Sequence, residues 1–166
     1  MRTYQRLYRE GGTYFFTVVT SDRWPCFEHV GRVRALGNAL RRVRGTHPFE
    51  TAAIVVLPDH LHCIWKLPSG DLDFSLRWQL VKKKFANSLQ TKRRIWQPRF
   101  WEHLIRNEDD MDRHMDYIHY NPVKHGLAAT PAEWPHSSFR HQVRIGAYPL
   151  DWGASAPTGI GGLDFE

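Results

Sequence analysis

LPDHLHCIW, residues 57–65, contains the connection between two apolar runs, and these runs predict the central strands of the fold. The runs cover residues 51–57 and 60–67. Between them stand Pro58 and Asp59, which are typical of a tight turn, so we expect two antiparallel neighbouring strands.

The second of these strands carries two histidines at alternate positions. Because successive side chains of a strand point to opposite faces, His60 and His62 should share one face and Leu61 and Cys63 the other. Neutral imidazole is a common metal ligand, so the pair forms half of a candidate metal site. We expect Cys63 in the core rather than as a ligand.

The flanking sequence predicts strands and helices in alternation. Residues 13–20 are rich in β-branched and aromatic residues and predict a strand. Residues 28–44 carry apolar side chains at helical spacing, and Gly45 should end this helix. A second amphipathic helix is expected over residues 71–90 and a further strand over residues 99–106.

A third helix should follow Asn107, which is a plausible N-cap before three acidic residues. Pro122 should end it at or near Asn121. The order β-α-β-β-α-β with one more helix predicts an α+β fold, a ferredoxin-like sandwich with an antiparallel sheet. Residues 1–152 should form a single domain, and residues 153–166, rich in Gly, Ala, Pro and Ser, an irregular and flexible tail.

The composition favours a polyanionic partner. The 166 residues include 23 Lys and Arg against 17 Asp and Glu, which gives a net charge of +6, and they include seven Trp, six Tyr and nine Phe. Positive charge attracts nucleic acid, and flat rings can stack on unpaired bases. Two cysteines, Cys26 and Cys63, are too few for a disulfide scaffold. With no expected signal peptide or membrane span, we predict a cytoplasmic protein.

The third helix carries a polar stripe. His114, Tyr117 and Asn121 lie at i, i+3 and i+7, whereas Tyr120 faces elsewhere. If this helix covers the sheet face that bears the histidines, the site combines two imidazoles, an amide oxygen and a phenol. Three protein ligands leave positions open for a substrate oxygen, so a phenol could attack a polarised phosphodiester. The alternative is a half-buried tyrosine and an asparagine that caps the helix.

Five motifs together are similar to those of a known family. They are LPDHLH (57–62), FWEH (100–103), DYIHYNPVKHGL (116–127), WPHSSF (134–139) and YPLDW (148–152). The chain resembles the REP-associated tyrosine transposases of bacteria, a group of the single-tyrosine HUH transposases, in which U is a hydrophobic residue.

The resemblance implies a chemistry and its residues. It implies Mg²⁺ or Mn²⁺ held by His60, His62 and Asn121, with Tyr117 as the nucleophile. The implied substrate is single-stranded DNA near repetitive extragenic palindromes, which fold as hairpins; cleavage would leave a 5′-phosphotyrosyl link and a free 3′-hydroxyl. Related insertion-sequence enzymes carry Gln where this chain has the shorter Asn121. They are dimers, whereas this family implies a monomer, with a dimer as the alternative.

Further residues are candidates for accessory or binding roles. His114 shares the stripe of Tyr117, and Lys124 could bring positive charge to a phosphate or to the helix C-terminus. Tyr4, Tyr8 and Tyr14 are candidates for stacking on bases. The candidates for phosphate contacts, each of which could equally be an ordinary solvated side chain, are Arg2, Arg6, Arg9, Arg41, Arg42, Lys82, Lys83, Lys84, Arg93 and Arg94.

Three functions remain open from the sequence. The first is a metal-dependent endonuclease and strand transferase for single-stranded DNA. The second is a regulator that binds REP hairpins without cleaving them. The third is a metal-dependent hydrolase of a small phosphoester, and the high pI argues mildly against it.

Overall fold

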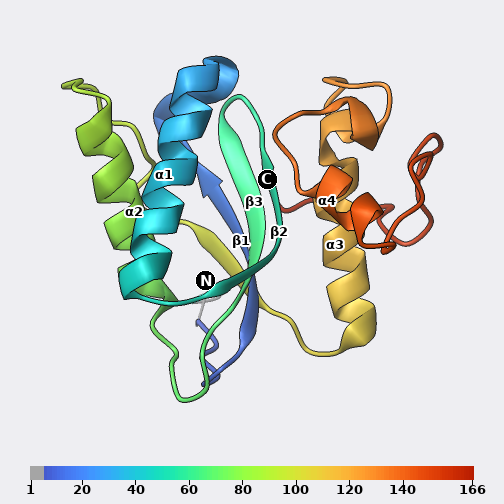
Figure 1. Cartoon of the computed structure of the whole chain (residues 1–166), viewed down its shortest axis with the longest axis horizontal. Helices are drawn as coiled ribbons and strands as arrows, with labels where there is room; N and C mark the ends of the chain where they lie inside the picture. The colour runs from blue at the N-terminus through green and yellow to red at the C-terminus, as the bar shows by residue number, and fades with distance from the viewer. Residues whose placement is uncertain (1–5) are drawn as a thin grey trace, which may run out of the picture.

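The computed structural model describes residues 6–166, so the predictions for Arg2 and Tyr4 lie outside the described residues. Four strands form one antiparallel sheet in the order β2-β3-β1-β4 (Figure 1). Their bounds are β1 Thr13–Val19, β2 Glu50–Val56, β3 His60–Lys66 and β4 Trp101–Leu104. This strand order with its two intervening helices confirms the predicted ferredoxin-like α+β sandwich.

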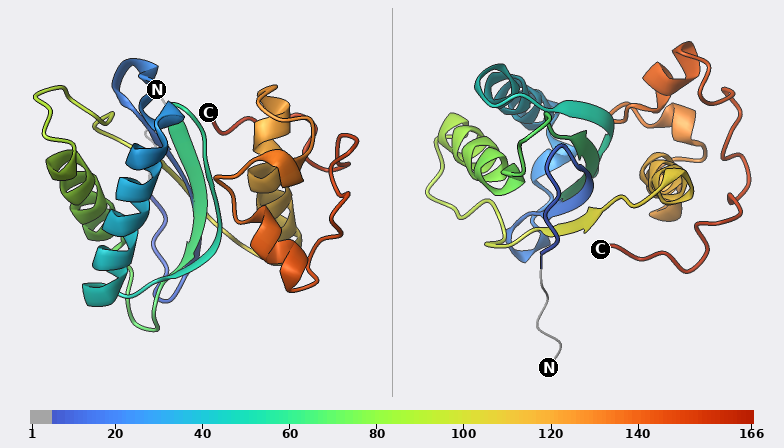
Figure 2. Two further views of the ribbon diagram at one scale, coloured as in Figure 1. Left: turned by 45° about the horizontal axis from the view of Figure 1, so that its top comes forward. Right: turned by 90° about the horizontal axis from the view of Figure 1, so that it is seen from below.

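Helices α1, Val30–Thr46, and α2, Phe74–Ser88, cover one face of the sheet. Figure 2 shows this layer on the opposite side of the sheet from α3 and α4. Trp65 of β3 stacks on Trp78 of α2 with ring centroids 4.2 Å apart. Cys63 is fully buried in the same core, as the alternation along β3 predicts.

Helix α3, Glu108–Lys124, covers the other face and builds a second core there. Phe15 and Ile64 from the sheet pack against Tyr117 and Ile118 from the helix. The predicted N-cap is confirmed, because the side-chain oxygen of Asn107 accepts a hydrogen bond from the Asp110 N–H at 2.8 Å. α3 therefore lies on the sheet face that bears His60 and His62.

Two predicted helix ends are wrong. α1 runs through Gly45 to Thr46, because Gly45 stays in helical conformation. α3 runs through Pro122 to Lys124; Pro122 lacks a backbone N–H donor, but it stands in the last turn, where only two helical residues follow it.

The true end of α3 is set by Gly126. Its φ of +68° is left-handed, its N–H donates to the Val123 carbonyl at 2.9 Å, and the Leu127 N–H reaches the Pro122 carbonyl at 2.9 Å. This is a Schellman C-cap. Because the helix continues past Asn121, Lys124 and the C-cap residue His125 lie beyond it, toward the sheet.

Short elements complete the chain. The 3-10 helices are Ser21–Arg23, Cys26–Glu28 and Pro131–Glu133, and α4 covers Phe139–Arg144. The segment before α4 extends the edge of the sheet, since Ser137 forms a bridge with Val55. After α4 the chain passes around the outside of α3, and its end returns to the sheet (Figure 2). Within residues 6–166, no helix has the length and apolar character to cross a bilayer.

Candidate active site between β3 and α3

The two histidines of β3 are buried and oriented by neighbours. His60 is 2% exposed and His62 is fully buried. His60 Nδ1 lies 2.6 Å from Asp59 Oδ1, and His62 Nδ1 lies 2.8 Å from the hydroxyl of Thr17, which is its cross-strand partner on β1. Because the Thr17 hydroxyl donates to the Phe165 carbonyl at 2.7 Å, it must accept from His62 Nδ1–H. Both Nδ1 atoms therefore have partners outside the site, and both Nε2 atoms face the site. The same arrangement holds metal-ligating histidines in orientation in metal centres.

Helix α3 brings Tyr117 and Asn121 over these rings. The rings of Tyr117 and His62 lie 5.2 Å apart, and Asn121 is fully buried. Among the described residues, three buried atoms here lack a well-formed hydrogen bond: His60 Nε2, His62 Nε2 and Asn121 Oδ1. Unpaired buried polar atoms are rare and costly. Two imidazole nitrogens and one amide oxygen are suitable ligands for a divalent cation, so the donor set fits the implied metal.

Burial and charge set the protonation of the histidines. Burial lowers the pKa of His62 to about 4, so this ring is neutral and able to ligate at neutral pH. Burial also opposes charge on His60, but the carboxylates of Asp59 and Glu166 outweigh it and raise the pKa of His60.

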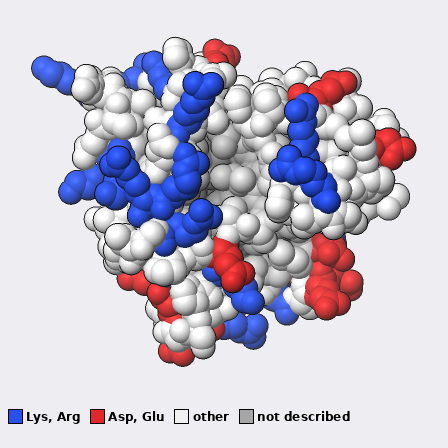
Figure 3. Space-filling model, viewed as in Figure 1, with Lys and Arg blue, Asp and Glu red and all other residues white. Residues whose placement is uncertain are grey.

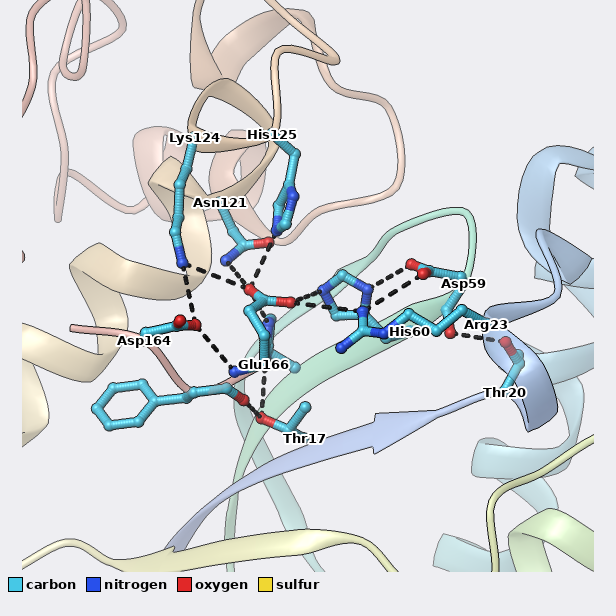
Figure 4. A network of polar contacts seen from close by, with 12 residues as sticks. Thr17, Thr20, Arg23, Asp59, His60, Asn121, Lys124, His125, Asp164 and Glu166 are labelled. Carbon is cyan, nitrogen blue, oxygen red and sulfur yellow. Dashed lines mark hydrogen bonds and ion pairs between the residues drawn. The ribbon is translucent and has the colours of Figure 1, made fainter. Parts of the chain in front are cut away.

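The carboxylate of Glu166, the last residue of the sequence, lies at the centre of the site (Figure 4). Its Oε2 is 2.8 Å from His60 Nε2, and its Oε1 is 3.4 Å from His62 Nε2 and 3.0 Å from His125 Nε2. Lys124 Nζ lies 3.6 Å from the same carboxylate. Although burial favours its neutral form, the three histidines lower the pKa of Glu166 well below its usual range. The site thus holds an anionic group among three histidines and a lysine.

The amide of Asn121 can present either edge to the site. Its Nδ2 donates to Glu166 Oε1 at 3.4 Å, which leaves Oδ1 without a partner among the described residues. A half-turn of the amide would offer the oxygen to a cation instead, and the two orientations have nearly the same shape.

The Tyr117 hydroxyl takes part in the same network. It donates to Glu166 Oε1 at 2.8 Å and accepts from Lys124 Nζ at 3.2 Å and from the Phe165 N–H at 3.3 Å. Burial first, and then the Glu166 carboxylate, raise the pKa of Tyr117 above its ordinary value. Tyr120 contacts Trp152 on another side of α3. Of the two predicted accessory residues, Lys124 reaches the phenol.

His114 lies in a different set of contacts. Its Nδ1 is 2.7 Å from the Asp110 carbonyl, and its ring is parallel to that of His103 at 4.6 Å. His103, Asp110 and His114 form a second cluster of possible ligand atoms. Parallel rings do not direct their in-plane lone pairs at one point, and Asp110 already accepts from the Arg106 N–H at 2.9 Å. We therefore interpret this cluster as a structural network.

Of the predicted candidates near the N-terminus, those that the structure describes lie away from this site. Tyr14 is fully buried and its hydroxyl donates to the Arg9 carbonyl at 3.0 Å, so no base can stack on it in this structure. Tyr8 is half exposed and stacks on Phe74. Arg6 pairs with Glu102 at 3.5 Å, again on the side of α2.

The basic candidates on α1 and α2 form a surface over those helices (Figure 3). Lys82 is turned inward to the Gln97 carbonyl at 3.0 Å, and Arg93 covers the ring of Trp24 at 4.6 Å. The exposed basic candidates here are Arg41, Arg42, Lys83, Lys84, Arg93 and Arg94. Since α1 and α2 cover the opposite face of the sheet, this surface and the His60 site are on different faces of the sheet.

Sequence reasoning missed Arg23 and Glu166. Arg23 lies 3.3 Å from Asp59 and 4.0 Å from Glu166, and it lines two pockets of about 290 Å³ each, one with His60 and His125 and one with Trp101. Asp22 and Arg23 both have positive φ, at 54° and 50°, which is uncommon for residues other than glycine and often marks a functional site. No pattern in the sequence signals this conformation. Glu166 stands in a segment whose composition suggests only flexibility.

Comparisons with known proteins agree on one family. A REP-associated tyrosine transposase from Escherichia coli (strain K12) is 49% identical over 152 residues, which cover 92% of this chain and 91% of the relative. A relative from Haemophilus influenzae (strain ATCC 51907 / DSM 11121 / KW20 / Rd), named for the same family, is 39% identical over 98% of this chain and 99% of its own length. A solved structure of such a transposase bound to a REP hairpin has a TM-score of 0.87 and 46% identity, with 96% of each chain covered. No protein-family model matches the chain.

Proposed function

The chain belongs to the family of REP-associated tyrosine transposases, and we propose that it cleaves and joins single-stranded DNA beside REP-like hairpins through a covalent bond to Tyr117. The observation that carries the proposal is the position of Tyr117 next to three possible ligand atoms without a well-formed hydrogen bond, those of His60, His62 and Asn121. A phenol beside such a donor set is suited to phosphoryl transfer.

Cleavage begins with attack of the Tyr117 oxygen on phosphorus. The bond from phosphorus to the 3′-oxygen breaks, which leaves a free 3′-hydroxyl and a 5′-phosphotyrosine. Attack of a 3′-hydroxyl on this phosphotyrosine is the reverse step, and it joins a strand and frees the phenol. The energy of the phosphodiester is kept in the protein–DNA bond, so joining needs no other energy source.

The residues of the site have separate tasks. When bound at His60, His62 and Asn121, Mg²⁺ or Mn²⁺ would polarise the phosphodiester and neutralise charge in its transition state. Asp59 and Thr17 hold the two imidazoles in orientation. Lys124, 3.2 Å from the phenol, stabilises the phenolate as its proton is lost to solvent, and the departing 3′-oxygen takes up a proton in turn.

The proposed partner is a DNA hairpin with a single-stranded flank, bound by one copy of the chain. Two pockets share Arg23: one is lined also by His60 and His125, and the other by Glu166 and by the basic and aromatic side chains of Arg99, Phe100 and Trp101. Such a combination suits an unpaired strand. The separate basic surface over α1 and α2 suits the phosphates of a duplex stem.

The test is a covalent adduct assay. Incubation of the protein and Mn²⁺ with a single-stranded oligonucleotide that contains a REP-like hairpin should give a protein–DNA band that survives denaturation. Tyr117→Phe should abolish the band, and the matched control Tyr120→Phe should retain it. The reverse pattern would contradict the assignment of the nucleophile.

The same samples separate the other candidate functions. Tight, salt-sensitive hairpin binding that chelator does not affect, without any adduct, would identify a binding regulator. Turnover of a small phosphoester that survives Tyr117→Phe would identify a hydrolase.

A further inference from the structure

An aromatic slot lies beside Tyr117, formed by Phe15, Trp101, His114 and Tyr117 and filled by Phe165. The ring of Phe165 is nearly parallel to Trp101, at 5.0 Å and 18°, and to His114, at 4.9 Å and 13°. The edges of the slot are Phe15 at 5.3 Å and Tyr117 at 4.9 Å. These are the separations and angles of stacked and edge-on aromatic pairs.

The residue after Phe165 places an anion at the nucleophile. Glu166 lies 2.8 Å from both the Tyr117 hydroxyl and His60 Nε2. Two successive residues therefore hold a flat ring in the aromatic slot and a negative group at the point of attack. A nucleotide has the same two parts, a flat base and an adjoining phosphate.

We propose that the aromatic slot binds the base of a nucleotide that adjoins the cleaved phosphate and so helps to choose the cleavage position. This inference rests on the function proposed above, and it adds a contact to the base where that function needs only the phosphate.

The surroundings of the slot favour a DNA strand as its occupant. Trp101 also lines the pocket of about 290 Å³ that contains Arg23 and Arg99, so the strand beyond the stacked base would pass two guanidinium groups. Guanidinium groups pair well with phosphates, and aromatic rings accept any base. The Phe165 main chain is held by Thr17 and Tyr117, groups that a sugar or phosphate oxygen could use in its place.

The test uses abasic oligonucleotides with a variant whose slot is empty, Phe165→Ala with Glu166→Ala. Removing the base of one of the two nucleotides that adjoin the cleaved phosphate should slow adduct formation by roughly tenfold or more, the usual effect of losing one stacked base. With Trp101→Leu added, the same abasic site should cause no further loss, and Trp101→Phe should restore the sensitivity. Equal rates of adduct formation for both abasic oligonucleotides and the intact one would overturn the proposal. The proposal would also be overturned if the abasic site slowed the Trp101→Leu variant as much as the variant that keeps Trp101.

A binding measurement tests the slot without cleavage. This measurement uses a variant that carries Phe165→Ala, Glu166→Ala and Tyr117→Phe. The fluorescent base 2-aminopurine replaces the base whose removal slows adduct formation. Its fluorescence should fall on binding, because it stacks on Trp101. Trp101→Leu should abolish this quenching, and its absence with Trp101 present would overturn the proposal. A missing adduct with every oligonucleotide would instead count against the chemistry at Tyr117, while the fluorescence would still report on the slot.

Discussion

Glu166 Oε1 lies 2.8 Å from the Tyr117 hydroxyl and accepts its hydrogen bond, so the proposed nucleophile and a carboxylate of the same chain are in direct contact. The same carboxylate contacts His60, His62 and Lys124. A phosphate bound as proposed would therefore compete with Glu166 for one set of partners.

Glu166→Ala should accelerate formation of the DNA adduct by about tenfold or more. Hydrogen bonds to charged groups contribute about 1.5–3 kcal/mol each, and the substitution removes those that hold the carboxylate over Tyr117. The adduct assay at limiting oligonucleotide measures the rate. Asp164→Ala is the matched control, since Asp164 is mostly exposed and its carboxylate contacts Lys124 and the Glu166 N–H rather than His60 or Tyr117. A slower rate in Glu166→Ala would show that the carboxylate assists the reaction, for example as a metal ligand.

His62→Gln should weaken Mn²⁺ binding by at least tenfold, because it removes an imidazole whose Nε2 faces the site. Isothermal titration calorimetry measures the affinity, with thermal unfolding to verify the fold. His103→Gln is the control, because His103 belongs to the network with Asp110. Two nitrogen donors also favour Mn²⁺ over Mg²⁺, which prefers oxygen ligands. Equal affinity for the two ions in the unaltered protein would contradict this donor set.

Asp59→Asn should weaken Mn²⁺ affinity by about 10–100-fold without direct contact to the ion, since Asp59 fixes the ring of His60 at 2.6 Å. Thr17→Val should act similarly through His62. The readout is again calorimetric affinity, with Asp109→Asn, exposed in the first turn of α3, as the control of equal charge. If all three variants bind Mn²⁺ alike, the orienting role is wrong.

Two glycine substitutions should have opposite effects on stability. Gly45→Ala should raise the free energy of unfolding by about 0.5–1 kcal/mol, because Gly45 is helical and its added Cβ meets no atom within 4 Å. Gly126→Ala should lower it by about 1–2 kcal/mol, because φ is +68° there. Urea unfolding measures both. A stabilised Gly126→Ala would mean that the end of α3 does not depend on left-handed geometry.

Local sequence patterns were enough to predict the sheet and the pairing of its histidines. The turn at Pro58 and Asp59 and the alternation along β3 act over a few residues, so His60, His62 and Cys63 are placed as predicted. The stripe that joins Tyr117 to Asn121 depends only on helical spacing, and it indeed faces the sheet.

Such local patterns do not predict contacts between segments that are far apart in the sequence. The approach of Glu166 to His60 depends on the path of the chain around α3, which no short-range signal encodes. The end of α3 was misplaced because the rule for Pro122 neglects how well Gly126 closes the last turn. Tyr14 was proposed for stacking, although it alternates with Phe15 along β1 and faces the α1 and α2 layer.

One residue step along β3 separates the imidazoles from the side chains of the large core. A slip of the strand by one position would bury His60 and His62 among the tryptophans and turn Leu61 and Cys63 toward Tyr117. A misregistered chain would therefore lack the proposed metal site. Cation binding during refolding would thus report that β3 has its native register. Collapsed molecules with a shifted register would give no such signal.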